Sequence, residues 1–168
     1  MKDLLVGCTG FVGGNLKKAH FFEGECHSGN IHEYYGSEPE LCVYAGVPSA
    51  MYLANLNPEE DLRIVRQALN NILQIRPRKL VLISTVAVYK KAIEVDEKSE
   101  LQVEDLPAYG YNRALLEEWV REEFEDVLVV RLPALYGDGL KKNFLYDLHH
   151  IVPAMLKKEK YEDVSQYS

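Results

Sequence analysis

The chain has 168 residues, of which 47% are hydrophobic and 27% charged, a composition that excludes disordered and fibrous proteins and suits one domain. Its 26 acidic and 19 basic side chains give a formal net charge of -7, which argues against nucleic-acid binding because phosphate contacts need a basic surface. No apolar run reaches the roughly 18 residues of a membrane span, and the first residues lack the apolar core of a signal peptide. We therefore expect a cytoplasmic protein with no membrane partner.

In chain order, we predict a strand at 3–6, a helix at 11–20, strands at 24–27 and 41–45, a helix at 57–76, a strand at 79–84, a helix at 108–124, a strand at 127–132 and a helix at 141–156. This alternation indicates βαβ units. The predicted fold class is α/β: a Rossmann-like, doubly wound parallel sheet of about five strands in a three-layer α/β/α arrangement. We assign residues 1–156 to this domain and 157–168 to a polar C-terminal tail.

The helix at 57–76 has the clearest predicted ends. Asn57 is a favourable N-cap and Pro58 suits the first helical position. The helix is expected to end near Arg76, because Pro77 disfavours the helical conformation of the residue before it.

The sequence does not indicate a metal site. Cys8, Cys26 and Cys42 are widely spaced and lack the CxxC or Cys/His spacing of a zinc site. His149 and His150 are adjacent, so on a helix they would point about 100° apart and would not chelate one ion. We expect the cysteines to be small buried residues.

A glycine-rich loop follows the first predicted strand. Gly7, Gly10 and Gly13 have GxxGxxG spacing and lead into the helix at 11–20. Glycine permits a tight turn at 7, lets the backbone approach a pyrophosphate at 10, and lets the helix pack closely on the strand at 13. Because the helix N-terminus offers N–H groups to an anion, this position favours a phosphate-binding loop over a purely structural turn.

A tyrosine and an arginine lie four residues apart on the helix at 108–124. Tyr109 and Arg113 share the side of Leu116 and Val120, the apolar stripe expected to face the sheet. A cation beside a phenol favours its deprotonated form, which a general acid/base needs near neutral pH. The alternative is a packed tyrosine with the arginine stacked on its ring.

Hydroxyl side chains end the strand at 79–84. At the carboxyl end of a strand, Ser84 and Thr85 would lie at the ligand crevice of an α/β fold. Thr85 would then hydrogen-bond a substrate oxygen and help to orient the phenol. The alternative is a local hydrogen bond between Thr85 and the backbone of the next turn.

Five motifs form a recognisable set over residues 1–140. They are Gly7-x-Thr9-Gly10-Phe11-Val12-Gly13, Ala45-Gly46, Ser84-Thr85-x-x-Val88-Tyr89, Tyr109-Gly110-x-x-Arg113 and Arg131-Leu132-Pro133-x-x-Tyr136-Gly137. In this order they resemble the extended short-chain dehydrogenases/reductases, and in particular the NAD-dependent epimerase/dehydratase family, which acts mainly on nucleotide sugars.

The resemblance implies hydride transfer between a sugar carbon and NAD(P), with Tyr109 as the catalytic acid/base and Thr85 as its hydrogen-bonding partner. Arg113 would hold the nicotinamide ribose, and Pro133 would line the nicotinamide site. The other cofactor-binding residues implied are Gly7, Thr9, Gly10, Phe11, Val12, Gly13, Ala45, Gly46 and Ser84.

Two departures from the family bear on the cofactor. Position 113 is Arg where the family normally has Lys, and a planar guanidinium would bind ribose from different atoms. The second strand ends without an acidic residue for the adenosine ribose, so Ser28 and Asn30 would bind its hydroxyls. No Lys or Arg occurs between Lys18 and Arg63 to meet a 2′-phosphate, which favours NAD over NADP.

Length is the largest departure. The family's C-terminal substrate domain is absent or truncated here, so the fold is expected to be reduced and the sugar pocket to need completion by another chain. We therefore weigh an NAD(P)-dependent enzyme against a non-catalytic dinucleotide-binding sensor or regulatory module. A flavodoxin-like phosphate-binding domain would leave Tyr109 and Arg113 unexplained. A homodimer through the helix at 108–124 is a further hypothesis, with Leu115 and Trp119 at either an interface or the core.

Overall fold

The computed structural model describes residues 1–137, 139 and 140. The elements are β1 (Asp3–Val6), α1 (Phe11–Ala19), β2 (Gly24–Cys26), the 3-10 helix η1 (Ile31–Tyr34), β3 (Leu41–Tyr44), α2 (Met51–Leu56), α3 (Pro58–Ile75), β4 (Leu80–Thr85), the 3-10 helix η2 (Val86–Val88), α4 (Ala108–Glu123) and β5 (Val127–Leu132). The predicted helix at 141–156, the tail at 157–168 and both His149 and His150 lie outside the described residues.

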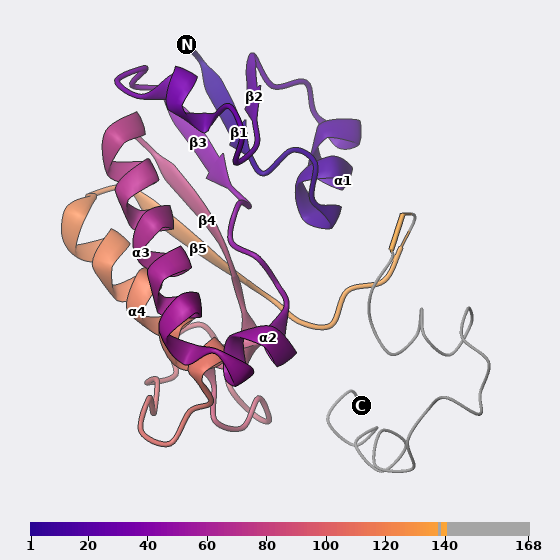
Figure 1. Cartoon of the computed structure of the whole chain (residues 1–168), viewed down its shortest axis with the longest axis vertical. Coiled ribbons are helices and arrows are strands. Elements are labelled where there is room, and N and C mark those ends of the chain that lie inside the picture. The colour runs from indigo at the N-terminus through magenta and orange to yellow at the C-terminus, as the bar shows by residue number, and fades with distance from the viewer. Residues whose placement is uncertain (138, 141–168) are drawn as a thin grey trace. The chain divides into compact units, whose positions relative to one another are not determined.

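Five strands form one parallel sheet in the order β2-β1-β3-β4-β5. From β1 the chain leads to β2 at one edge of the sheet, and β3, β4 and β5 then follow on the other side of β1. The strand order therefore reverses between β1 and β3 (Figure 1). In doubly wound folds the ligand crevice lies at such a switch point, beyond the carboxyl ends of the strands. The predicted strands are confirmed to within one residue at each end, and η1 and α2 are elements that the sequence pattern did not predict.

Alternating strand residues build two hydrophobic cores, one on each face of the sheet. Leu4 and Val6 of β1 face α3 and α4, with which they form the larger core. Leu5 faces the other side, where it packs with Phe22 and, from α1, Leu16. These faces give the three layers that the sequence predicts (Figure 1).

The two ends of α3 lie where the sequence predicts them, but the predicted N-cap hydrogen bond is absent. Asn57 precedes α3 and Pro58 opens it, yet the Asn57 side chain makes no capping hydrogen bond. Arg76 ends the helix in the left-handed conformation, with φ of 56°. The N–H of Arg76 still bonds to the Ile72 carbonyl at 3.0 Å, which closes the last turn.

The cysteines are free. Cys26 and Cys42 are buried as predicted, whereas Cys8 is half-buried. Burial raises the pKa of the Cys26 thiol to about 12, because the thiolate would be poorly solvated there. This thiol is therefore protonated near neutral pH.

The chain divides into two units, Met1–Pro133 and Ala134–Ser168. The sheet and all the helices named above belong to the first unit. In the second, the N–H of Leu140 donates to the Gly137 carbonyl at 3.2 Å. Within the described ranges, no helix is long and apolar enough to span a membrane.

Candidate active site

The glycine loop lies at the carboxyl end of β1 and is held by backbone hydrogen bonds. The N–H groups of Gly7 and Cys8 donate to the Cys26 carbonyl at 2.8 and 3.1 Å. Gly7 has φ of 87°, a conformation that favours glycine. A Cβ on Gly13 would lie 2.1 Å from the Gly7 carbonyl oxygen, so α1 approaches the loop more closely than any side chain allows.

The start of α1 adds unbonded N–H groups to this loop. The helix begins at Phe11, after Gly10 in an extended conformation, and no side chain caps it. The first N–H groups of a helix have no partner within it, and together with the helix dipole they favour an anion. Thr9 and Gly10 are exposed beside them, and Phe11 and Val12 are half-buried.

Two other predicted cofactor residues lie beside the loop. A Cβ on Gly7 would lie 2.4 Å from the Ala45 carbonyl oxygen and 2.9 Å from the Gly46 nitrogen. The end of β3 therefore packs directly against the tight turn. Because this is where the strand order reverses, the structure brings the two backbone motifs together at the expected crevice.

The residues after β2 form a local turn. The Asn30 side-chain oxygen accepts a hydrogen bond from the His27 N–H at 2.9 Å, and the Gly29 N–H donates to His27 Nδ1 at 3.0 Å. Ser28 is exposed at the tip. The Asn30 amide oxygen is thus engaged by the turn, while the Ser28 hydroxyl faces solvent.

Tyr109 lies at the start of α4 and is 7% exposed. Its N–H donates to the side-chain oxygen of Asn55, on α2, at 2.9 Å. A Cβ on Gly110 would lie 2.2 Å from the Ala87 carbonyl oxygen, so this turn of α4 contacts η2 directly. Contacts with two other elements, α2 and η2, therefore fix the position of the tyrosine.

Arg113 contacts Tyr109 through the face of its ring. The guanidinium carbon lies 4.0 Å from the ring centroid, the stacked arrangement that the sequence left as an alternative. The same guanidinium forms an ion pair with Asp61 of α3 and donates to the Pro48 carbonyl at 2.8 Å. It also lies 3.3 Å from the Tyr109 carbonyl oxygen.

Ser84 and Thr85 point to opposite faces of β4. The Ser84 hydroxyl donates to the Glu117 carboxylate on α4. Thr85 Oγ1 accepts from the Ala87 N–H at 3.1 Å, which is the local bond that the sequence left open. Within residues 1–137, no hydrogen bond joins the hydroxyls of Thr85 and Tyr109.

A buried network that the sequence did not predict lies beside Ser84. Glu117 is 0% exposed, and its carboxylate accepts from Arg131 Nη2 at 2.6 Å and from Arg131 Nε at 3.0 Å. Arg131 also donates to the Tyr89 hydroxyl, which itself donates to the Asp96 carbonyl at 2.8 Å. An acidic residue on the buried stripe of a helix was the available signal for this network.

Pro133 and Trp119 are two further residues that the sequence singled out. Pro133 follows β5 and is exposed. Trp119 is half-buried and packs against the larger core. In the described part of the chain, no three His, Cys, Asp or Glu side chains are grouped as a metal site would require.

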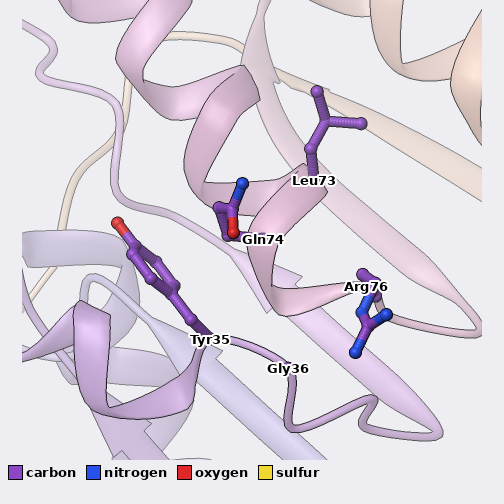
Figure 2. Close-up of a pocket in the computed structure, with 5 residues that line it drawn as sticks. All are labelled: Tyr35, Gly36, Leu73, Gln74 and Arg76. Carbon is purple, nitrogen blue, oxygen red and sulfur yellow. The ribbon is translucent and has the colours of Figure 1, made fainter.

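A hollow of about 460 Å³ lies elsewhere on the molecule. Figure 2 shows its lining, where the segment before β3 meets the end of α3. These are the amino ends of β3 and β4, so the hollow is at the opposite end of the strands from the glycine loop. Its lining residues are Tyr35, Gly36, Leu73, Gln74 and Arg76.

The family comparison identifies the chain's relatives. The model of the NAD dependent epimerase/dehydratase family matches residues 26–165, which leaves the glycine loop outside the matched region. No curated protein matches the sequence.

Solved structures share the fold at low identity. A dTDP-4-dehydrorhamnose reductase from Clostridium acetobutylicum is 18% identical with a TM-score of 0.71, covering 90% of this chain and 59% of its own. The corresponding reductase from Bacillus anthracis, in complex with NADP, is 19% identical with a TM-score of 0.71, at 90% and 60% coverage. A UDP-glucose 4-epimerase from Thermotoga maritima, with UDP-glucose, is 14% identical with a TM-score of 0.57, at 78% and 55%.

The chain thus spans about 60% of the length of the two reductases, which confirms the predicted reduced fold. The strand order 2-1-3-4-5 is that of flavodoxin-like domains, and the classic Rossmann order 3-2-1-4-5-6 reduces to it when the third strand is absent, so strand order alone does not separate the two. The family match covers most of the chain and separates the two. The chain belongs to the NAD-dependent epimerase/dehydratase family.

Proposed function

We propose that the chain is the dinucleotide-binding part of an NAD(P)-dependent oxidoreductase or epimerase that acts on nucleotide sugars. The observation that carries the proposal is the glycine loop, where Gly7 and Gly13 hold the backbone too close for any side chain, next to the start of α1. This geometry suits a pyrophosphate. The family match and the sugar-nucleotide enzymes among the solved structures support the substrate class.

In this proposal Tyr109 is the acid/base and Thr85 its partner. Thr85 Oγ1 already accepts one hydrogen bond, but its hydroxyl hydrogen can still be donated to a phenolate or a substrate oxygen. The bound cofactor would supply the hydride chemistry. Gly7, Gly10, Gly13, Ala45 and Gly46 would contribute the backbone of the cofactor site, whereas the Ser84 hydroxyl is engaged by the buried Glu117 carboxylate.

The residues after β2 favour NAD. Ser28 is exposed where the adenosine ribose of a dinucleotide would lie, and no Lys or Arg follows until Arg63. Lys17 of α1 is paired with Glu25 of β2, which reduces its ability to meet a 2′-phosphate. We therefore expect NAD and NADH to bind more tightly than NADP and NADPH.

A second function, dinucleotide binding without catalysis, is favoured by one observation. Arg113 stacks on the Tyr109 ring and is neutralised by Asp61, so its charge is already compensated by the protein. Arg113→Lys and Arg113→Ala, measured beside the parent for NADH oxidation with a 4-keto nucleotide sugar, separate the two functions. Turnover that is lost with Tyr109→Phe supports the enzyme. Binding without turnover in all variants supports the module when a chain that completes the sugar pocket is also present.

Calorimetric titration with the four dinucleotides tests the proposal itself. Gly10→Asp places a carboxylate at the loop and is expected to abolish binding by repelling the pyrophosphate. Gln67→Glu, which adds the same charge on the exposed side of α3, is the control and is expected to bind like the parent. Absence of binding by the parent, or equal binding by Gly10→Asp, would contradict the proposal.

The cytoplasmic location and the homodimer stay predictions. Sedimentation of the purified chain checks the homodimer.

A further inference from the structure

Arg113 and Asp61 form a buried ion pair between α4 and α3. Arg113 is 4% and Asp61 5% exposed, so each charge depends on the other for compensation. Removal of one member of such a pair leaves an uncompensated buried charge, which is strongly unfavourable. The pair is therefore a fixed part of the structure, unlike an ion pair on the surface.

The Asp61 carboxylate is itself held from two further sides. The same oxygen accepts a hydrogen bond from the Asn112 side chain at 2.8 Å. Asp61 also lies in the first turn of α3, where the helix dipole favours a negative charge. The carboxylate is thus held in place while it binds the guanidinium.

We propose that Asp61 is a positioning residue that retains the Arg113 guanidinium on the face of the Tyr109 ring and so keeps it away from the nicotinamide ribose. The inference rests on the proposed dinucleotide binding at this crevice. A buried carboxylate is a stronger acceptor for a guanidinium than a neutral ribose hydroxyl. The other terminal nitrogen of Arg113 donates to the Pro48 carbonyl, so a second donor of the planar guanidinium is also engaged.

This arrangement has a measurable consequence for the two halves of the cofactor. ADP carries the adenosine and both phosphates of NAD but lacks the nicotinamide riboside. The ratio of NAD affinity to ADP affinity therefore reports contacts to the nicotinamide half alone. With Arg113 retained by Asp61, replacement of the arginine by methionine should leave this ratio unchanged.

The main experiment is calorimetry of NAD and ADP with the parent, Asp61→Asn, Arg113→Met and the double variant. Asp61→Asn is expected to raise the NAD-to-ADP ratio about tenfold, the size of one hydrogen bond to a charged group, because the freed guanidinium reaches the ribose. Arg113→Met and the double variant are expected to keep the parent's ratio. Glu60→Gln, the same change one residue earlier at an exposed carboxylate paired with Arg63, is the control.

Two results would overturn the inference. One is an unchanged ratio in Asp61→Asn. The other is a lower ratio in Arg113→Met, which would mean that the arginine already contacts the nicotinamide half despite Asp61. The second result can be obtained even where Asp61→Asn fails to fold.

A measurement without ligand separates this inference from the proposed function. The NMR signals of the Tyr109 ring carbons can be assigned by comparison with Tyr109→Phe. Their chemical shifts should change in the same direction in Asp61→Asn and in Arg113→Met, because both substitutions remove the guanidinium from the ring face. Shifts confined to Arg113→Met would show that the stack does not depend on Asp61. Absence of both NAD and ADP binding, with the ring shifts as expected, would refute the dinucleotide function while retaining Asp61 as the residue that holds Arg113.

Discussion

The glycine loop and the start of α4 are built in different ways. At the loop, Gly7 and Gly13 are determined by backbone approach, and their nearest contacts are carbonyl groups a few residues away or on the adjoining strand end. At the start of α4, Tyr109 is positioned by side chains from other elements, among them Asn55 and, through Arg113, Asp61. The glycine spacing of the first region is local in the sequence, although Gly7 also packs against Ala45, whereas the second region depends on side chains about 50 residues away.

The largest expected effect concerns the tertiary network. Glu117→Ala leaves Arg131 and the Ser84 hydroxyl without their buried acceptor, and we expect a loss of about 3–5 kcal/mol in the free energy of unfolding, measured with urea. Glu118→Ala, at the adjacent exposed position, is expected to change it by less than about 0.5 kcal/mol. Equal effects of the two substitutions would mean that the network contributes nothing.

Substitutions at the glycine loop are expected to change stability less, and the neighbouring Gly13 and Gly14 give a direct comparison. Gly13→Ala would place its Cβ 2.1 Å from a carbonyl oxygen, and we expect it to cost about 1–3 kcal/mol and to weaken NAD binding. At Gly14 the nearest atom is 3.8 Å away, so Gly14→Ala should stabilise the helix by about 0.5–1 kcal/mol. If both variants have the parent's stability, the close approach at Gly13 is not a real constraint.

The smallest effect concerns Asp3, at the start of the strand that carries the loop. Hydrogen bonds from the Glu23 N–H and then from His20 lower the Asp3 pKa. Because the folded state holds the proton less tightly than the unfolded chain, this contribution to stability is present above the ordinary carboxyl pKa of about 4 and is lost as the pH falls through the folded value.

Urea unfolding from pH 7 to pH 3 checks this dependence. Asp3→Asn should be less stable than the parent by a constant amount at the upper end, and the difference should shrink below about pH 4. A difference that does not depend on pH would exclude the carboxylate's charge as its cause.

The secondary structure could be predicted because its signals are local. The five strands and three of the predicted helices lie where apolar periodicity placed them, and Pro58 opens α3 as expected. The short helix α2 was missed, since its large side chains Met51, Tyr52, Leu53 and Leu56 are exposed and show no buried stripe. Its role depends on Asn55, whose contact with the N–H of Tyr109 no pattern within six residues can reveal.

The sequence by itself determined the parallel α/β fold, the glycine loop and the family, because glycine spacing and apolar periodicity act over one or two turns of chain. Only the tertiary structure decided which groups Arg113 and Ser84 contact on other elements. A side chain bonds to whichever acceptor folding brings within about 3 Å, and for Arg113 that acceptor, Asp61, lies on another helix. The sequence shows that position 113 carries a positive charge, but the packing of α3 against α4 determines which acceptor the guanidinium contacts.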